Sequence, residues 1–71
     1  MTTQERIKML MIQGGDKGTQ DELVNILHIS KPSIVNKLKG RQEFKLKEIR
    51  EFAEYYNLTD EQIVSTFIRR N

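Results

Sequence analysis

Residues 19–39 read TQDELVNILHISKPSIVNKLK, and two amphipathic segments in this stretch flank a three-residue break. Thr19 begins a capping box, with a glutamate three residues later, so we predict a helix over about residues 19–27. Ser30 is a favourable N-cap, and the proline two positions later fits the first turn of a second helix, which we predict over about residues 31–39. Two short helices at this spacing form a helix-turn-helix.

Three further helices are predicted around this pair. Apolar residues at helical spacing and a capping threonine predict the first over about residues 3–13. A second covers about residues 45–57, although its expected cap is not Ser, Thr, Asp or Asn, and a capping box at Thr59 opens a terminal helix. With no strand signal in the chain, we predict one all-α domain of five helices over residues 1–71.

The composition removes several functional classes. Hydrophobic residues make up 37% of the chain and charged residues 31%, which is typical of a small globular domain. With no cysteine and one histidine, the sequence offers no disulfide, no thiolate nucleophile and no set of metal ligands. The longest apolar run, Met9–Ile12, is far too short to span a membrane. We therefore expect a cytoplasmic protein with no cofactor, metal or membrane partner.

His28 and three glutamates carry chemistry that enzymes use, but their positions do not favour catalysis. His28 falls in the predicted turn, where a left-handed backbone is often needed, and no second ligand lies at a suitable spacing. Glu48, Glu51 and Glu54 recur every three residues, which predicts a solvated helix face and not an acid–base pair. No nucleophile motif or phosphate-binding glycine loop is present, so we do not expect an enzyme.

The charge of the chain is concentrated in one segment. Residues 31–47 contain six cationic side chains and one carboxylate, a net charge of +5, whereas the rest of the chain carries −3 of the total of +2. A positive patch on an otherwise acidic domain is typical of a protein that binds a polyanion. The simpler alternative is a lysine-rich solvated face.

The second helix of the predicted pair presents two different faces. On a helical wheel Ile34, Val35 and Leu38 share the buried sector, and Ser33 and Asn36 lie roughly opposite. A polar edge of this kind reads bases when a helix enters the major groove, and an asparagine amide can pair with adenine in a bidentate contact. An ordinary polar helix surface is the simpler alternative. We predict base contacts from Lys31, Pro32, Ser33 and Asn36.

Phosphate contacts are predicted on both sides of this edge. Gln20 lies in the first turn of its helix, where its amide and the free backbone N–H groups favour an anion. The other candidates are hydroxyl or cationic side chains close to the base-reading helix: Thr19, Lys37, Lys39, Arg41 and Lys45, of which Lys37 and Lys39 flank the polar edge. Such contacts are independent of sequence and sensitive to salt.

From Thr19 to Leu58 the chain, with TQDELVNILHISKPSIVNKLKGR followed by LKEIREFAEYYNL, resembles the phage Cro and repressor type of helix-turn-helix family, also called XRE. The resemblance covers 40 of the 71 residues and implies a lambda-repressor-like bundle of five helices. It also implies a phosphate contact at Gln20, backbone contacts at Lys39 and Arg41, and base-facing positions at Lys31, Pro32, Ser33 and Asn36. Two residues depart from the family pattern, since Val24 replaces a small alanine and His28 replaces the turn glycine.

Together these observations predict a transcription regulator that binds operator DNA, of the Cro-like phage or prophage repressor kind, located in the bacterial cytoplasm and on the nucleoid when bound. We expect a homodimer at least on DNA and no small-molecule ligand. Val64, Phe67 and Ile68 are the predicted dimer contacts, because they exceed what a small core absorbs. The alternative is a protein-interaction module of the same shape, such as an antirepressor or antitoxin. An RNA-binding role is disfavoured by the lack of an aromatic stacking surface.

Overall fold

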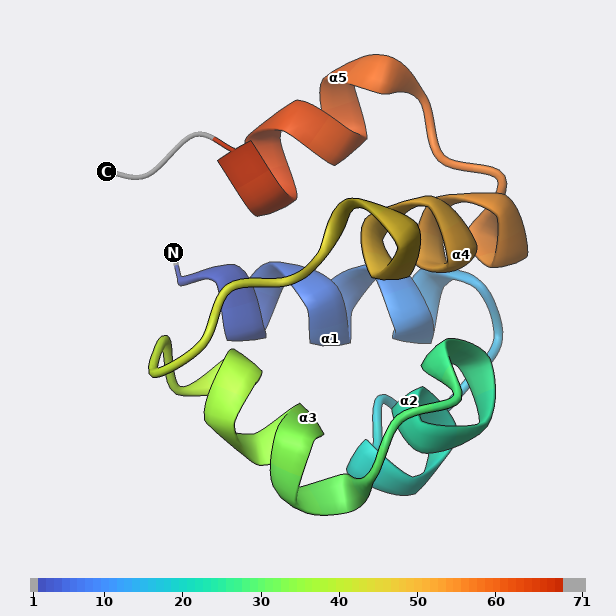
Figure 1. Cartoon of the computed structure of the whole chain (residues 1–71). Helices are drawn as coiled ribbons and strands as arrows, with labels where there is room; N and C mark the ends of the chain where they lie inside the picture. Colours follow the sequence, from blue (N-terminus) through green and yellow to red (C-terminus); the bar gives the residue numbers. More distant parts are fainter. Residues whose placement is uncertain (1, 69–71) are drawn as a thin grey trace.

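The computed structural model describes residues 2–68, and the chain folds there into five α-helices (Figure 1). The helices are α1 (Thr3–Gln13), α2 (Gln20–Leu27), α3 (Lys31–Leu38), α4 (Leu46–Tyr56) and α5 (Asp60–Ile63), and α5 continues into a π-helical stretch, η1 (Val64–Ile68). No strand occurs within these residues, so the predicted all-α fold with five helices is confirmed. Of the domain predicted over residues 1–71, residues 1 and 69–71 lie outside the described part.

The helices begin where the sequence predicts, because their caps are local. The Thr19 hydroxyl accepts the Glu22 N–H at 3.2 Å, and the Glu22 carboxylate accepts the Thr19 N–H at 2.8 Å. Thr2 and Thr59 form the same reciprocal arrangement at the starts of α1 and α5. Ser30 caps α3 by accepting the Ser33 N–H. These hydrogen bonds occupy backbone N–H groups that the first turn of a helix leaves without a partner.

The core lies between α1, α2, α3 and α4. Figure 1 shows α1 running through the middle, with α4 and α5 on one side of it and α2 and α3 on the other. Phe52 is completely buried, and its ring centroid lies 4.9 Å from that of Tyr56. The other members of the buried apolar cluster are Ile7, Met11, Leu23, Ile26, Leu27 and Ile34. Every helix from α1 to α4 contributes to this cluster, so the position of α3 depends on all of them.

The turn between α2 and α3 has the conformation expected from the sequence. His28 adopts a left-handed backbone, with φ 58° and ψ 38°, and its N–H donates to the Val24 carbonyl at 2.9 Å. Val24 packs against the buried cluster, so this larger residue is accommodated where the resembled family has alanine. The His28 side chain is exposed, with Nε2 3.9 Å from Glu51. The prediction of a turn residue at His28 is therefore confirmed.

The last described residues, 64–68, differ from the terminal α-helix that the sequence predicts. In η1 the wider i→i+5 turn changes which side chains face the core. Thr66 is buried with 2% exposed, and the Phe67 ring makes edge contacts with Phe44 and Phe52 at centroid distances of 5.3 and 5.7 Å. Phe67 is thus half-buried and packs against the buried cluster, and the predicted dimer contact of its ring stays a prediction. Ile68 is 62% exposed.

Candidate nucleic-acid interface

The outer face of α3 and the residue that follows it form the centre of the candidate interface. Ile34 is completely buried, and Leu38 packs against the buried cluster, so these residues fix which side of α3 faces the core. Pro32 and Lys39 are exposed and Asn36 is half-buried; they follow one another along the opposite side at spacings of four and three residues. The wheel expectation for Asn36 thus agrees with the position that the structure gives this residue.

At its N-terminal end, α3 is connected to α2 by exposed polar contacts. The Lys31 ammonium lies 3.1 Å from Asp21 Oδ1, and both side chains are more than half exposed. An exposed ion pair of this kind contributes at most about 1 kcal/mol, so Lys31 can leave it readily. The Ser30 hydroxyl donates to Ser33 Oγ at 3.0 Å, which directs the Ser33 side chain toward the cap.

The first turn of α2 holds the two other N-terminal candidates. The Thr19 hydroxyl oxygen is engaged as the helix cap, which leaves its O–H proton for another acceptor, and Gln20 is half-buried. The N–H groups of Thr19 and Lys17 donate to Glu22 and lower the pKa of its carboxyl. Because Glu22 and Asp21 already place two carboxylates in this turn, the helix end is less favourable for a phosphate than its backbone alone suggests.

Lys37 occupies a different position from the one predicted. Its side chain faces inward with 8% exposed, and Nζ lies 2.5 Å from both carboxylate oxygens of Glu48, which is 5% exposed. Lys37 follows Ile34 by three residues, so it shares the side of the helix that faces the protein. The structure therefore corrects two expectations: Lys37 is not available to a phosphate, and Glu48 does not belong to a solvated face.

The surroundings of the Glu48 carboxyl favour its ionised form. Burial on its own raises the pKa of this carboxyl, but the hydrogen bond from Lys37 and the Lys45 N–H at 2.8 Å outweigh burial and lower it. The Lys45 N–H belongs to the N-cap residue of α4, which has no capping side chain of its own. Glu48 therefore serves both as the counter-ion of α3 and as the cap of α4.

The connection between α3 and α4 carries the exposed cations of the site. Lys39, Arg41 and Lys45 are all exposed, and no ion pair within residues 2–68 engages them. The Arg41 N–H donates to the Asn36 carbonyl at 2.9 Å, and Gly40 adopts a φ of 79° that permits this tight reversal. We call residues 39–45 the basic loop; its cations lie directly beyond the exposed side of α3.

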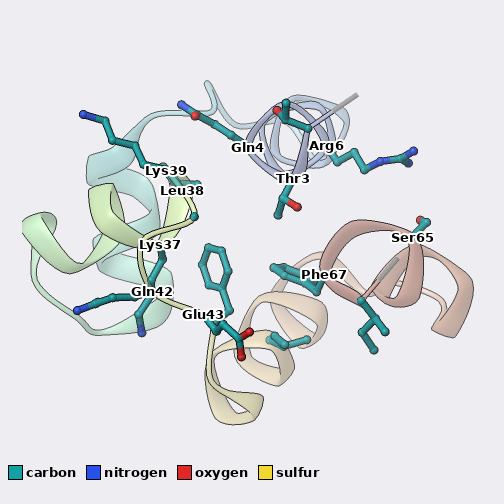
Figure 2. Close-up of a pocket in the computed structure, with 15 residues that line it drawn as sticks. Thr3, Gln4, Arg6, Lys37, Leu38, Lys39, Gln42, Glu43, Ser65 and Phe67 are labelled. Carbon is teal, nitrogen blue, oxygen red and sulfur yellow. The ribbon is translucent and has the colours of Figure 1, made fainter. Parts of the chain in front are cut away.

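A groove with a volume of about 880 Å³ lies beside α3, between the start of α1, the basic loop and η1 (Figure 2). Figure 2 shows Phe67 turned toward the middle of this groove, whereas Lys39 and Gln42 extend outward from its wall. Within the described residues no group of histidine, aspartate and glutamate side chains could hold a metal ion. In the same part of the chain, no helix has the length and apolar character needed to cross a membrane.

Sequence reasoning missed the contributions of Asp21 and Glu48. Asp21 lies between the two capping-box residues of α2, and the sequence does not identify it as the partner of Lys31, because that contact depends on how α2 and α3 cross. The Glu48 contact joins residues 11 apart in sequence, across a loop whose path the sequence does not specify. One signal was present: Glu48 stands three residues after Lys45, the spacing of a capping box at a helix start that lacks a capping side chain.

Two short helices joined by a left-handed turn, with the second helix exposed beside a basic loop, define a small all-helical domain of the helix-turn-helix type. The sequence comparison gives the family. The chain belongs to the BetR domain family, which matches residues 1–67, and such a domain is of a regulatory kind. No curated protein and no solved structure matches the chain.

Proposed function

We propose that the protein is a sequence-specific DNA-binding transcription regulator that inserts α3 into the major groove. The observation that carries this proposal is the continuity of the exposed face of α3 with the basic loop. A polar face that is flanked on one side by exposed cations can read bases while the cations contact the phosphates beside the groove. Membership of a family of regulatory domains also supports a regulatory role.

Each residue of the site has a proposed role. Asn36 reads an adenine edge, Pro32 contacts a thymine methyl group, and Lys31 leaves Asp21 to reach a guanine or a phosphate. Ser33 lies at the margin of this face, directed toward its cap. The proposed phosphate contacts are Lys39, Arg41 and Lys45 from the basic loop, and Thr19 and Gln20 from α2; Lys37 is not among them.

The finer proposal is an operator-binding repressor of the Cro and XRE type, as in phages and prophages, acting in the bacterial cytoplasm without catalysis or a cofactor. Such a protein binds as a homodimer to half-sites about one DNA turn, or about 34 Å, apart. We assign the dimer contact to Ile68, which is exposed, together with the half-buried Val64 and Phe67. The resemblance of residues 19–58 to this family supports the proposal.

The test is selection of bound duplexes from a random pool, followed by titration of the selected sequence and a random duplex against salt. We expect a preference for a pseudo-palindrome, a steep salt dependence, and loss of the preference in Asn36→Ala. Asn25→Ala is the matched control, because Asn25 is exposed on α2 and lies outside the proposed contacts. A wild type without sequence preference contradicts the proposal and favours the alternative, a protein-interaction module of the antirepressor or antitoxin kind.

A further inference from the structure

One buried carboxylate closes the basic loop at both ends. Glu48 accepts two hydrogen bonds from the Lys37 ammonium at the end of α3 and one, at 2.8 Å, from the Lys45 N–H at the start of α4. The chain between these two anchors includes Lys39 and Arg41, which are exposed. Its path is therefore closed by a side chain that is itself almost inaccessible to solvent.

The base-reading residue is attached to the same unit. The Asn36 carbonyl accepts the N–H of Arg41 at 2.9 Å and that of Gln42 at 3.4 Å, so the basic loop folds back on the last turn of α3. These two backbone hydrogen bonds hold the middle of the loop, and Glu48 holds its ends. Any movement of the start of α4 relative to α3 changes where the loop cations lie relative to the Asn36 side chain.

Stability alone is a weak reason for a buried ion pair in this position. Taking two charges out of water costs most of what their attraction returns, and apolar residues of similar volume often replace such pairs without loss. What an apolar pair does not reproduce is the directional hydrogen bond that Glu48 accepts from the Lys45 N–H. The distinctive contribution of the carboxylate is thus the fixed geometry of the loop.

We infer that Lys37 and Glu48 are positioning residues for DNA binding, which hold the basic loop so that its cations meet phosphates while Asn36 reaches the bases. Neither side chain touches the DNA itself, because both are buried on the side of α3 that faces the protein. The inference rests on the proposed function and adds to it a pair of residues that determine affinity without contacting the ligand. The inference also explains why Lys37, on the helix proposed to read the bases, faces the protein interior.

The experiment compares the wild type with the double variant Lys37→Met/Glu48→Leu, which replaces the ion pair by apolar side chains. Lys8→Met/Glu54→Leu is the matched control, because it removes one cation and one carboxylate at exposed positions outside the site. Two quantities are measured: hydrogen exchange of the Arg41 and Gln42 amides without DNA, and affinity for a selected and a random duplex against salt.

We expect the double variant to unfold cooperatively while its Arg41 and Gln42 amides exchange about tenfold faster than in the wild type. Its affinity should fall by a similar factor for both duplexes, since phosphate contacts are lost. The slope of log affinity against log salt concentration should decrease by about the amount that one phosphate contact contributes. The control double variant should match the wild type in both measurements. If the double variant does not fold, Glu48→Gln is used; it keeps an acceptor for the Lys45 N–H but removes the negative charge that holds Lys37, so changes in the same direction and of smaller size are expected.

Two outcomes overturn the inference. The first is a folded variant whose Arg41 and Gln42 amides exchange as in the wild type, because the pair then does not hold the loop. The second is faster exchange with unchanged DNA affinity and salt dependence, because the loop geometry then does not matter for binding. A wild type that binds no duplex overturns the proposed function, and with it the proposed phosphate contacts of the basic loop. The exchange measurement needs no DNA, so it shows separately whether the Lys37–Glu48 pair holds the loop.

Discussion

The two ends of α3 are held in different ways. At its start, the Ser30 hydroxyl accepts a backbone N–H three residues away, and the Lys31 contact with Asp21 is exposed. At its end, the Lys37 ammonium is buried against Glu48, 11 residues along the chain. The cap at the first end depends on neighbours in sequence, whereas the buried ion pair at the second end depends on where another helix has been placed. The comparison indicates that the end of α3 responds to a change elsewhere in the fold more strongly than its start.

The largest expected effect comes from removing one partner of the buried pair. Lys37→Met alone leaves the Glu48 carboxylate buried without its counter-ion, so we expect a loss of about 3 kcal/mol or more in the free energy of unfolding. Lys39→Met, two positions further on and exposed, is the control and should change stability by less than about 0.5 kcal/mol. Urea unfolding measures both. Equal stability of the two variants would show that Lys37 is hydrated and not buried.

Acid should weaken the same end of α3. The pKa of Glu48 in the folded protein lies below its unfolded value of about 4.3, so the folded state binds fewer protons. Its contribution is therefore complete above that pH and is lost as the pH falls through the lower folded pKa. We expect the free energy of unfolding to fall more steeply below about pH 4.3 in the wild type than in Lys37→Met/Glu48→Leu.

The comparison of these two proteins isolates Glu48. The carboxyls of Glu5 and Glu22 also have lowered pKa values, from hydrogen bonds at their capping boxes, but both residues are present in each protein. Parallel stability curves for the wild type and the double variant below pH 4.3 would contradict an ionised, paired Glu48.

The contrast between the two ends also explains what the sequence could predict. The starts of α1, α2, α3 and α5 followed from the sequence, because each cap and its partner lie three residues apart. The same holds for the left-handed turn at His28 and for the inward position of Ile34, which follow from local spacing. The candidate base-reading edge at Asn36 could be predicted for the same reason, since it lies opposite Ile34 on the wheel.

Features that depend on contacts between distant residues could not be predicted. A wheel places Lys37 at the margin of the apolar sector, where a lysine is solvated unless another element supplies a carboxylate, and Glu48 supplies one. The half-buried ring of Phe67 likewise packs against the buried cluster, where Phe44 and Phe52 lie beside it. In each case the sequence predicted the helix but not the environment of the side chain.

A smaller effect is expected at the start of α3. Ser30→Ala removes the cap that accepts the Ser33 N–H, and we expect a loss of about 1 kcal/mol in unfolding free energy. Ser33→Ala removes the partner of the Ser30 O–H but keeps the cap, so its cost should be a few tenths, or about 0.3 kcal/mol. Thermal unfolding of both variants tests the difference. A larger loss in Ser33→Ala would place the important hydrogen bond between the side chains and not at the backbone.

The smallest effect on stability, and one confined to binding, is expected at Asp21. Asp21→Asn removes the exposed partner of Lys31, so the free energy of unfolding should change by less than about 0.5 kcal/mol. In the proposed complex, however, Asp21 repels the phosphates and competes with DNA for Lys31, so affinity for both selected and random duplexes should rise by about threefold. Asp60→Asn, in the exposed first turn of α5, controls for the change in net charge. Because Asp21 lies on α2 and contacts the start of α3, away from the basic loop, the substitution should leave the Arg41 and Gln42 amides unaffected. A gain of equal size in Asp60→Asn would assign the effect to net charge and remove Asp21 from the interface.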